Sequence, residues 1–279
     1  MQHYGAAPAR QETRTLLAAA PFHPGRSAAA VAILAAAMLF SMRGASAQAV
    51  AADIPLEGGG TERVLFAGPA NPRAILIMLA GGDGIVEIGN TAAGGRLANN
   101  FLIRTLPLWT AQGFAIAILG SPNNQSLLGQ RHTPAYAAAI DRAVDFARTR
   151  ANAPVWLVGT SQGSIGAANG AARLGGKISG VVLTSSVTRR SQSGETVFDA
   201  SLATVAVPAL IGANQGDTCA ASPPADAETI AGYLGRSSRK EVTIVQSSDL
   251  RGDPCQAISP HGFYGIEPVV VQRIAQWIR

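Results

Sequence analysis

The chain has 279 residues and a formal net charge of +5, from 22 Lys and Arg against 17 Asp and Glu. Four of the basic residues and one acidic residue lie in the first 47 positions, so the remaining 232 residues carry a net charge of +2. No basic run with interleaved aromatic side chains occurs, which argues against nucleic-acid binding, and charge indicates no other particular partner. A chain of this length can bury a sizeable core as one domain.

The N-terminus has the layout of a signal peptide. Arg26 precedes the apolar run SAAAVAILAAAMLF at 27–40, and the small residues ASA at 45–47 follow it. The run has 14 residues, too few to cross a hydrocarbon core of about 30 Å comfortably, although an uncleaved anchor is the alternative. We therefore expect export to the periplasm or the medium, cleavage after Ala47, no stable membrane span thereafter, and one folded domain at 48–279.

Apolar, β-branched runs alternate with helical patterns along 48–279. The runs predict strands covered on both faces, at 63–67, 74–80, 114–119, 155–159, 180–185, 207–213 and 241–246. The helical patterns lie at 133–150, 163–174, about 223–235 and 267–278. Thr133 and Pro134 form a cap and first-turn pair at the start of the first of these helices. The alternation predicts an α/β domain with a doubly wound, mostly parallel sheet flanked by helices.

Polar and glycine-rich loops follow several of the predicted strands. In such sheets ligands bind outside the carboxyl ends of the strands. The loops read GGDG after 74–80, GSPNNQS after 114–119, TSQG after 155–159 and NQGDTC after 207–213. We expect chemistry in these loops and a flexible rim at the glycine-rich residues 83–100.

One of these loops places a serine between glycines. GTSQG at 159–163 matches Gly-x-Ser-x-Gly, in which the glycines let the nucleophile sit on a sharp strand-to-helix turn. An apolar run precedes Ser161 and the small-residue sequence SIGAANGAARL follows it, which is the context that this motif requires. The pattern predicts a nucleophile elbow at Ser161, and a serine that caps the next helix is the alternative.

A serine nucleophile needs a histidine base within hydrogen-bond reach and a third group that orients the base. Beyond residue 47 the chain has two histidines, His132 and His261. Triad residues on a sheet with this elbow follow in the order serine, acid, histidine, which selects His261. His132 precedes Ser161 and is interpreted as a rim or capping residue, with substrate contact as the alternative.

The acid is expected after a strand between Ser161 and His261. Asp217 lies there, in the loop after the run at 207–213. Asp249 follows the later run at 241–246, and RGDPC, which contains Asp253, is typical of a turn. Asp217 is therefore the predicted acid, and Asp253 is the reserve.

An acyl-transfer intermediate also needs amide donors for its oxyanion. The usual donors are the backbone N–H after the nucleophile and one from the loop after an earlier strand, which indicates Gln162 and either Gly82 or Asp83. The Asp83 side chain is expected either to bind ligand or to hold its own loop.

With these motifs the chain resembles the α/β-hydrolases over about residues 60–279. Ser161, Asp217 and His261 match the triad in order, and GGDG matches the oxyanion loop. The chain is similar to a group of exported bacterial α/β-hydrolases of undefined substrate that share a GTSxG elbow, a GDxC acid loop and an SPHGF histidine loop. Ala80 stands where the HGGG form of many lipases and esterases has its histidine.

The two cysteines lie close in sequence to the predicted acid and base. Cys219 comes two residues after Asp217, and Cys255 comes six residues before His261. A disulfide between them would tie the two loops together, and export would permit it. Two isolated buried thiols are the alternative, and two cysteines without nearby histidine ligands do not make a zinc site.

These features predict an exported serine hydrolase that acts on a small-molecule carboxylic ester through an acyl-enzyme, with no cofactor or metal. Amide hydrolysis, acyl transfer, and a noncatalytic binding module of the same fold are the alternatives. Residues 83–105, 121–133 and 186–204 are expected to determine specificity, and the last segment is too short for a large helical lid.

Overall fold

The computed structural model describes residues 46–278, so the predicted signal peptide lies outside the described residues except for its last two positions. The strands are β1 (Ser46–Pro55), β2 (Thr61–Pro69), β3 (Ile75–Leu79), β4 (Glu87–Ile88), β5 (Ala93–Gly94), β6 (Ala115–Leu119), β7 (Val155–Thr160), β8 (Gly180–Thr184), β9 (Ala209–Asn214) and β10 (Lys240–Val245). The helices are α2 (Phe101–Arg104), α3 (Leu106–Ala111), α4 (Pro134–Arg150), α5 (Gly163–Leu174), α6 (Asp226–Tyr233) and α7 (Glu267–Trp277).

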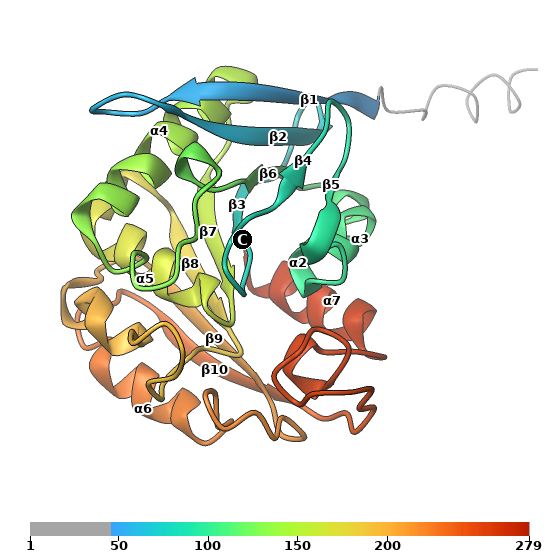
Figure 1. Ribbon diagram of the computed structural model, residues 1–279, viewed down its shortest axis with the longest axis vertical. Helices are drawn as coiled ribbons and strands as arrows, with labels where there is room; N and C mark the ends of the chain where they lie inside the picture. Colours follow the sequence, from blue (N-terminus) through green and yellow to red (C-terminus); the bar gives the residue numbers. More distant parts are fainter. Residues whose placement is uncertain (1–45, 279) are drawn as a thin grey trace, which may run out of the picture. The chain divides into compact units, whose positions relative to one another are not determined.

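Eight strands form one twisted sheet in the order β1-β2-β6-β3-β7-β8-β9-β10 (Figure 1). The six strands from β6 to β10 in this order run parallel to one another. At one edge, β2 pairs antiparallel with β6, and β1 pairs antiparallel with β2. The sheet is thus mostly parallel, as predicted.

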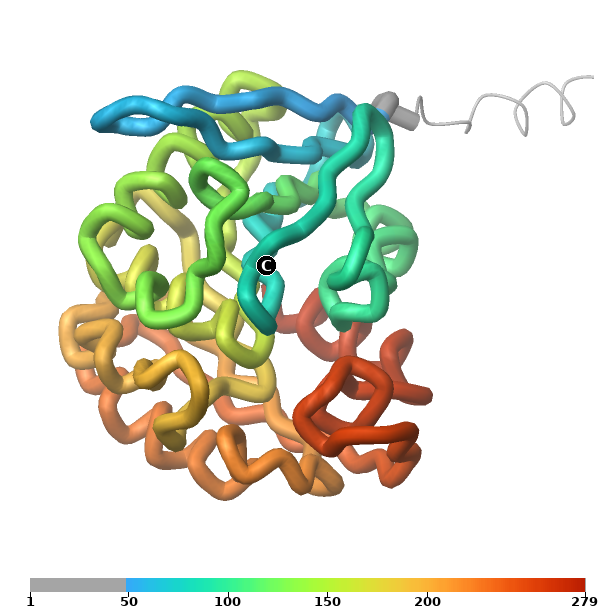
Figure 2. Tube along the Cα trace, in the orientation of Figure 1, coloured from blue at the N-terminus to red at the C-terminus, as the bar shows by residue number. Residues whose placement is uncertain are grey.

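Helices cover both faces of the sheet. One core contains side chains of α4, α5 and α6, and the other contains side chains of α2, α3 and α7. Figure 1 shows these two groups on opposite sides of the strands, and the chain trace in Figure 2 shows the same arrangement. Every residue of β3, β6, β7 and β8 is buried, which explains why these strands read as continuous apolar runs.

The predicted strands and helices are confirmed, with ends that differ by a few residues. The run at 241–246 was expected to be covered on both faces, but β10 is the edge strand of the sheet and only Val245 in it is buried. The short elements of 83–111 were not predicted in detail: β4 and β5 form a small antiparallel ribbon, and α2 and α3 follow it. Between β8 and β9 the chain forms two short 3-10 helices, Val197–Ala200 and Leu202–Thr204, and not a lid domain. None of the helices between residues 46 and 278 is long and apolar enough to cross a membrane.

The strand order reverses between β3 and β7. From β3 the chain proceeds to β6 on one side, and from β7 it proceeds to β8 on the other. Connections that leave in opposite directions open a crevice at the carboxyl ends of the two strands, where ligands of such sheets bind. Leu79 at the end of β3 is paired with Gly159 of β7, so the loop at 80–84 and the serine turn at 161 begin side by side.

Candidate active site

Ser161 occupies a strained turn between β7 and α5. Its φ angle is +54°, in the left-handed region that few non-glycine residues adopt. Both glycines of the motif are required by close packing, since a Cβ at Gly159 would collide with the Gly163 carbonyl and one at Gly163 would collide with the Leu79 carbonyl. The strain and the crowding are those of a nucleophile elbow.

The hydroxyl of Ser161 faces a histidine and caps no helix. His261 Nε2 lies 2.9 Å from Ser161 Oγ, while helix α5 has no side-chain hydrogen bond at its N-cap position. His261 Nδ1 lies 2.9 Å from Asp217 Oδ2. A carboxylate opposite Nδ1 favours the tautomer with the proton on that nitrogen, which leaves Nε2 free to accept the Ser161 proton.

The histidine loop is fixed by hydrogen bonds from two neighbouring segments and by one bond within the loop. His261 lies in a short 3-10 helix, Pro260–Gly262, and is 4% exposed. Ser185 Oγ donates to the His261 carbonyl at 2.7 Å, and Asn214 Nδ2 donates to the Pro260 carbonyl at 2.9 Å. The His261 N–H donates to Ser259 Oγ at 3.1 Å. The backbone around the imidazole therefore has little freedom to move relative to the sheet.

The Asp217 carboxylate is buried and accepts hydrogen bonds at both oxygens. Oδ1 accepts from the Cys219 N–H at 2.8 Å. Oδ2 accepts from Ser222 Oγ at 3.1 Å as well as facing His261. Ser222 Oγ in turn lies 2.9 Å from His261 Nδ1, and sequence reasoning missed this contact. Donors of this kind stabilise an ionised carboxylate in a buried position.

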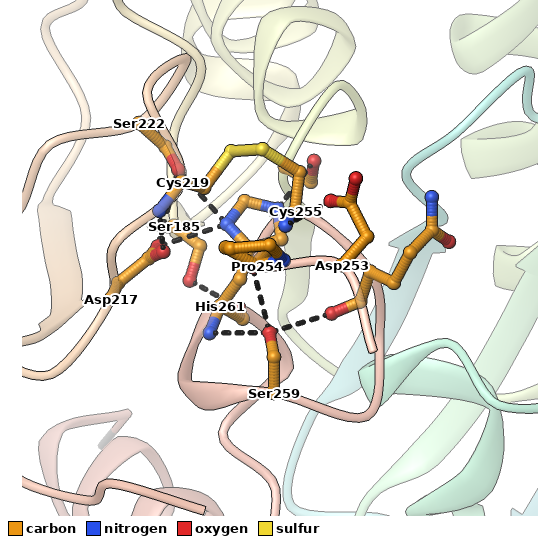
Figure 3. The surroundings of a disulfide bond; sticks show 11 residues. Ser185, Asp217, Cys219, Ser222, Asp253, Pro254, Cys255, Ser259 and His261 are labelled. Carbon is orange, nitrogen blue, oxygen red and sulfur yellow. Dashed lines mark hydrogen bonds and ion pairs between the residues drawn. A yellow bond between two sulfur atoms is a disulfide. The ribbon is translucent and has the colours of Figure 1, made fainter. Parts of the chain in front are cut away.

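The predicted disulfide is present and joins the acid loop to the histidine loop (Figure 3). Cys219 and Cys255 have an S–S distance of 2.03 Å and a Cα–Cα distance of 4.6 Å. Asp253, the reserve acid, is exposed, and its Oδ1 accepts from the Cys255 N–H at 2.7 Å. It forms a turn beside the disulfide, whereas Asp217 is the carboxylate that reaches His261.

The loop after β3 packs directly against the serine. A Cβ at Gly81 would lie 2.9 Å from Ser161 Cβ, so the backbone of this loop borders the nucleophile. The backbone N–H groups of Gln162, Gly82 and Asp83 donate to no acceptor within residues 46–278. Unpaired amides next to a nucleophile have the character of an oxyanion hole.

The Asp83 side chain holds its own loop. Its Oδ1 accepts from the Ile85 N–H at 3.1 Å, and its Oδ2 lies 2.8 Å from Arg96 Nη2. The Asp83 carboxylate was expected either to bind ligand or to hold its own loop, and the structure shows it holding the loop.

His132 joins two of the segments expected to determine specificity. Its Nδ1 lies 2.8 Å from Glu195 Oε2, and Glu195 Oε1 accepts from the Gly129 N–H at 3.0 Å. The Glu195 side chain is 2% exposed and that of His132 is 42% exposed. This pair fixes the loop that precedes α4 against the segment between β8 and β9. The contact agrees with the interpretation of His132 as a rim residue.

The site provides no set of free metal ligands. Donor atoms of Asp217, Cys219 and His261 lie within 4.8 Å of one another. The Cys219 sulfur belongs to the disulfide and has no thiolate to offer, and the other two side chains face each other. The donor set present therefore does not fit a metal.

A large cavity in the described part of the chain does not contain the triad. Its volume is about 920 Å³, and it lies between strands β1 and β2, the β4–β5 ribbon and the loop after β6. Neither Ser161 nor His261 lines it.

Comparison with known proteins identifies the fold. No model of a protein family matches the chain, and no curated protein matches it. A solved cold-adapted esterase from an Arctic intertidal metagenomic library is 14% identical, with a TM-score of 0.56 over 81% of this chain and 92% of that one.

Two further solved structures are similar. The Pyrococcus furiosus esterase is 10% identical, with a TM-score of 0.60 over 83% of this chain and 90% of that one. Dienelactone hydrolase from Anabaena variabilis is 15% identical, with a TM-score of 0.56 over 82% of this chain and 96% of that one. At these identities the likeness concerns the fold, and the chain has the α/β-hydrolase fold predicted from its motifs.

Proposed function

We propose that this chain is a serine hydrolase that cleaves carboxylic esters of small molecules through an acyl-enzyme. One observation carries the proposal: His261 lies 2.9 Å from Ser161 Oγ on one side and 2.9 Å from Asp217 Oδ2 on the other. This geometry is the one that nucleophilic catalysis by serine requires. The esterases and dienelactone hydrolase of the same fold support the ester as substrate class.

In the first half of the reaction, Ser161 Oγ attacks the ester carbonyl carbon while His261 Nε2 takes the hydroxyl proton. The carbonyl π electrons move to oxygen, and the oxyanion lies next to the Gln162 N–H and the loop at 81–83. As the tetrahedral intermediate collapses, the C–O bond breaks and His261 returns its proton to the leaving alcohol. Asp217 stabilises the imidazolium without taking its proton.

In the second half, water attacks the acyl-enzyme by the same route. His261 accepts a proton from water, and the carbonyl oxygen again becomes an oxyanion. On collapse the bond between the acyl carbon and Ser161 Oγ breaks, His261 returns its proton to Oγ, and the carboxylic acid leaves.

Export is part of the proposal. The signal-peptide layout at 1–47 supports it, and so does a disulfide within the catalytic loops, because such bonds persist in oxidising compartments.

Labelling with a fluorophosphonate tests the activity. We expect one equivalent of label on the Ser161 peptide of the wild type, identified by mass spectrometry, and none on Ser161→Ala. Ser164→Ala is the matched control, since Ser164 is a buried serine in the first turn of α5 whose Oγ donates to the Ser161 carbonyl and does not face His261. An unlabelled wild type would instead support a noncatalytic binding module.

Hydrolysis of p-nitrophenyl esters of graded acyl length then tests the substrate class. Turnover of any ester of this series supports the substrate class, and its absence across the whole series would count against it. Product analysis in the presence of an alcohol separates hydrolysis from acyl transfer, and p-nitroanilides measure the amide activity.

A further inference from the structure

Arg131 is buried completely behind the loop that borders the nucleophile. It precedes α4, and its relative exposure is 0%. Its Nη2 atom lies 2.9 Å from the Gly82 carbonyl oxygen and 3.4 Å from that of Ala80. Nε and Nη1 have no hydrogen-bond partner among the described residues. The contacts of this buried cation are thus directed at the backbone of one loop.

Burying an arginine is costly, which makes its location informative. A guanidinium group stays protonated in proteins, and removing it from water costs free energy unless charges or hydrogen bonds compensate it. Burial lowers the pKa of Arg131, and the nearby Glu195 and Asp83 carboxylates act in the opposite direction. No carboxylate forms a direct ion pair with it within residues 46–278, so the two carbonyls are its principal partners.

The position of the guanidinium group fixes the direction of two peptide N–H groups. In a trans peptide the C=O and N–H bonds point in opposite directions. The carbonyl of Gly82 points at Arg131, so the N–H of Asp83, in the same peptide unit, points away from it. The Ala80 carbonyl orients the Gly81 N–H in the same way, and Gly81 contacts Ser161.

A cationic donor on a carbonyl also strengthens the N–H of that peptide. Hydrogen bonds polarise the groups they join, and charge-assisted ones do so more strongly. The Asp83 N–H, which donates to no acceptor within residues 46–278, is therefore a better donor than an ordinary loop amide. Prearranged dipoles directed at a developing negative charge are a main source of catalysis in acyl transfer.

We propose that Arg131 is a positioning residue of the oxyanion hole, which directs and polarises the Gly82–Asp83 peptide so that the Asp83 N–H is the second oxyanion donor beside that of Gln162. The inference rests on the proposed serine hydrolase function. The inference selects Asp83 over Gly82 as the second oxyanion donor, a choice that the sequence alone left open. Gly84 follows with a φ of +79°, and a Cβ there would lie 2.6 Å from Leu127 Cδ1 and 2.8 Å from Arg131 Nη2, so the loop packs closely on both side chains.

Kinetics of Arg131→Lys and Arg131→Met test the role of the side chain. Losing one oxyanion donor costs about 10²–10³-fold in kcat. Arg131→Met keeps the Asp83 N–H but removes the cation that directs and polarises it. We therefore expect kcat per phosphonate-titrated site to fall about 10- to 100-fold, while KM stays within about 3-fold of the wild-type value. The Ki of a trifluoromethyl ketone, which forms a tetrahedral adduct, should rise by the same factor as kcat falls. Arg131→Lys should lie between Met and wild type.

Arg73→Lys is the matched control, because Arg73 Nη2 also donates to two backbone carbonyls, those of Ala275 and Ile278, outside the proposed active site. We expect its kcat per site to equal that of the wild type. A merely structural role of Arg131 would lower the titrated fraction of active enzyme while leaving kcat per site and the ketone Ki unchanged. That result would overturn the inference.

A crystal structure of the phosphonylated wild type decides the donor without any variant. We expect the phosphoryl oxygen within about 2.7–3.1 Å of the Gln162 and Asp83 nitrogens. An oxygen bonded to the Gly82 nitrogen, with the Asp83 N–H turned away, would refute the inference even if the Arg131 variants do not fold. Failure of the wild type to label at Ser161 would instead remove the proposed function itself.

Discussion

Ser222 Oγ lies 2.9 Å from His261 Nδ1, so two oxygens and not one face this nitrogen. Ser222 also donates to Asp217 Oδ2, so we expect it to position the proposed acid–base pair. A hydrogen bond to a charged group contributes about 1.5–3 kcal/mol. Since Asp217 still holds the imidazole in Ser222→Ala, we expect kcat on a p-nitrophenyl ester to fall only about 10-fold, with little change in KM.

Ser222→Thr keeps the hydroxyl and should recover most of this activity. Ser237→Ala is the control, since Ser237 Oγ donates to backbone carbonyls of Val207 and Arg239 at the opposite end of the sheet. An Ser222→Ala enzyme as active as the wild type would show that Asp217 alone orients His261.

Asp217→Asn should preserve the fold and nearly abolish hydrolysis. An amide in this position can donate to Nδ1, so it no longer selects the tautomer that leaves Nε2 free to accept the Ser161 proton. The expected loss in kcat is about 10⁴-fold, with an unchanged circular dichroism spectrum. Asp253→Asn is the matched control and should retain wild-type activity. The opposite pattern would assign the acid to Asp253.

Removing the disulfide should reduce stability. The bond joins residues 36 apart in sequence, and closing a loop of this size stabilises by about 3–4 kcal/mol in the chain-entropy model. We expect Cys219→Ala/Cys255→Ala to lose about this free energy of unfolding, measured by denaturant titration at 25 °C. In the wild type, reduction with dithiothreitol should have the same effect, and it should have none in the double variant. Equal stability of the two proteins would contradict the stabilising role.

Glu62 of β2 predicts a dependence of stability on pH. It is fully buried, neither carboxylate oxygen has a partner among the described residues, and burial raises its pKa from 4.5 to about 8. Between these values the folded chain keeps a proton on Glu62 that the unfolded chain releases, so the contribution of Glu62 to stability is greatest at low pH and falls as pH rises. The contribution to the slope is up to about 1.4 kcal/mol per pH unit.

Glu62→Gln removes the titrating group, so its free energy of unfolding should decline less between pH 5 and pH 8 than that of the wild type. The exposed Glu57 of the β1–β2 hairpin provides the control, and Glu57→Gln should follow the wild-type slope. Parallel curves for the wild type and Glu62→Gln would mean that the carboxyl is already paired or solvated.

The sheet and the serine–histidine–acid arrangement were predictable because their signals are local. Buried parallel strands read as short apolar runs, and the elbow needs two glycines around Ser161 whatever the rest of the chain does. The first strand was missed because β1 begins in the small-residue sequence that also has the form of a cleavage site, and it gains its structure from pairing with β2. Short strands such as β4 likewise depend on their partner and not on their own residues.

Ser222 and Arg131 could not be found from sequence because their roles arise from long-range contacts. Ser222 stands in an ordinary polar turn, and no spacing relates it to His261, which lies 39 residues further on. Arg131 contacts carbonyls 49 and 51 residues before it. Carbonyls are present at every position of a chain, so only the fold shows which of them an arginine reaches.

The disulfide also constrains how the protein can be made for study. In a reducing cytosol Cys219 and Cys255 would remain thiols, and the two loops that carry the acid and the base would fold without their link. Cys219 is buried while Cys255 is exposed, so an oxidant added after folding reaches the two sulfurs unequally. Recombinant production should therefore direct the chain to an oxidising compartment, or include a thiol–disulfide couple during refolding, before the proposed activity is measured.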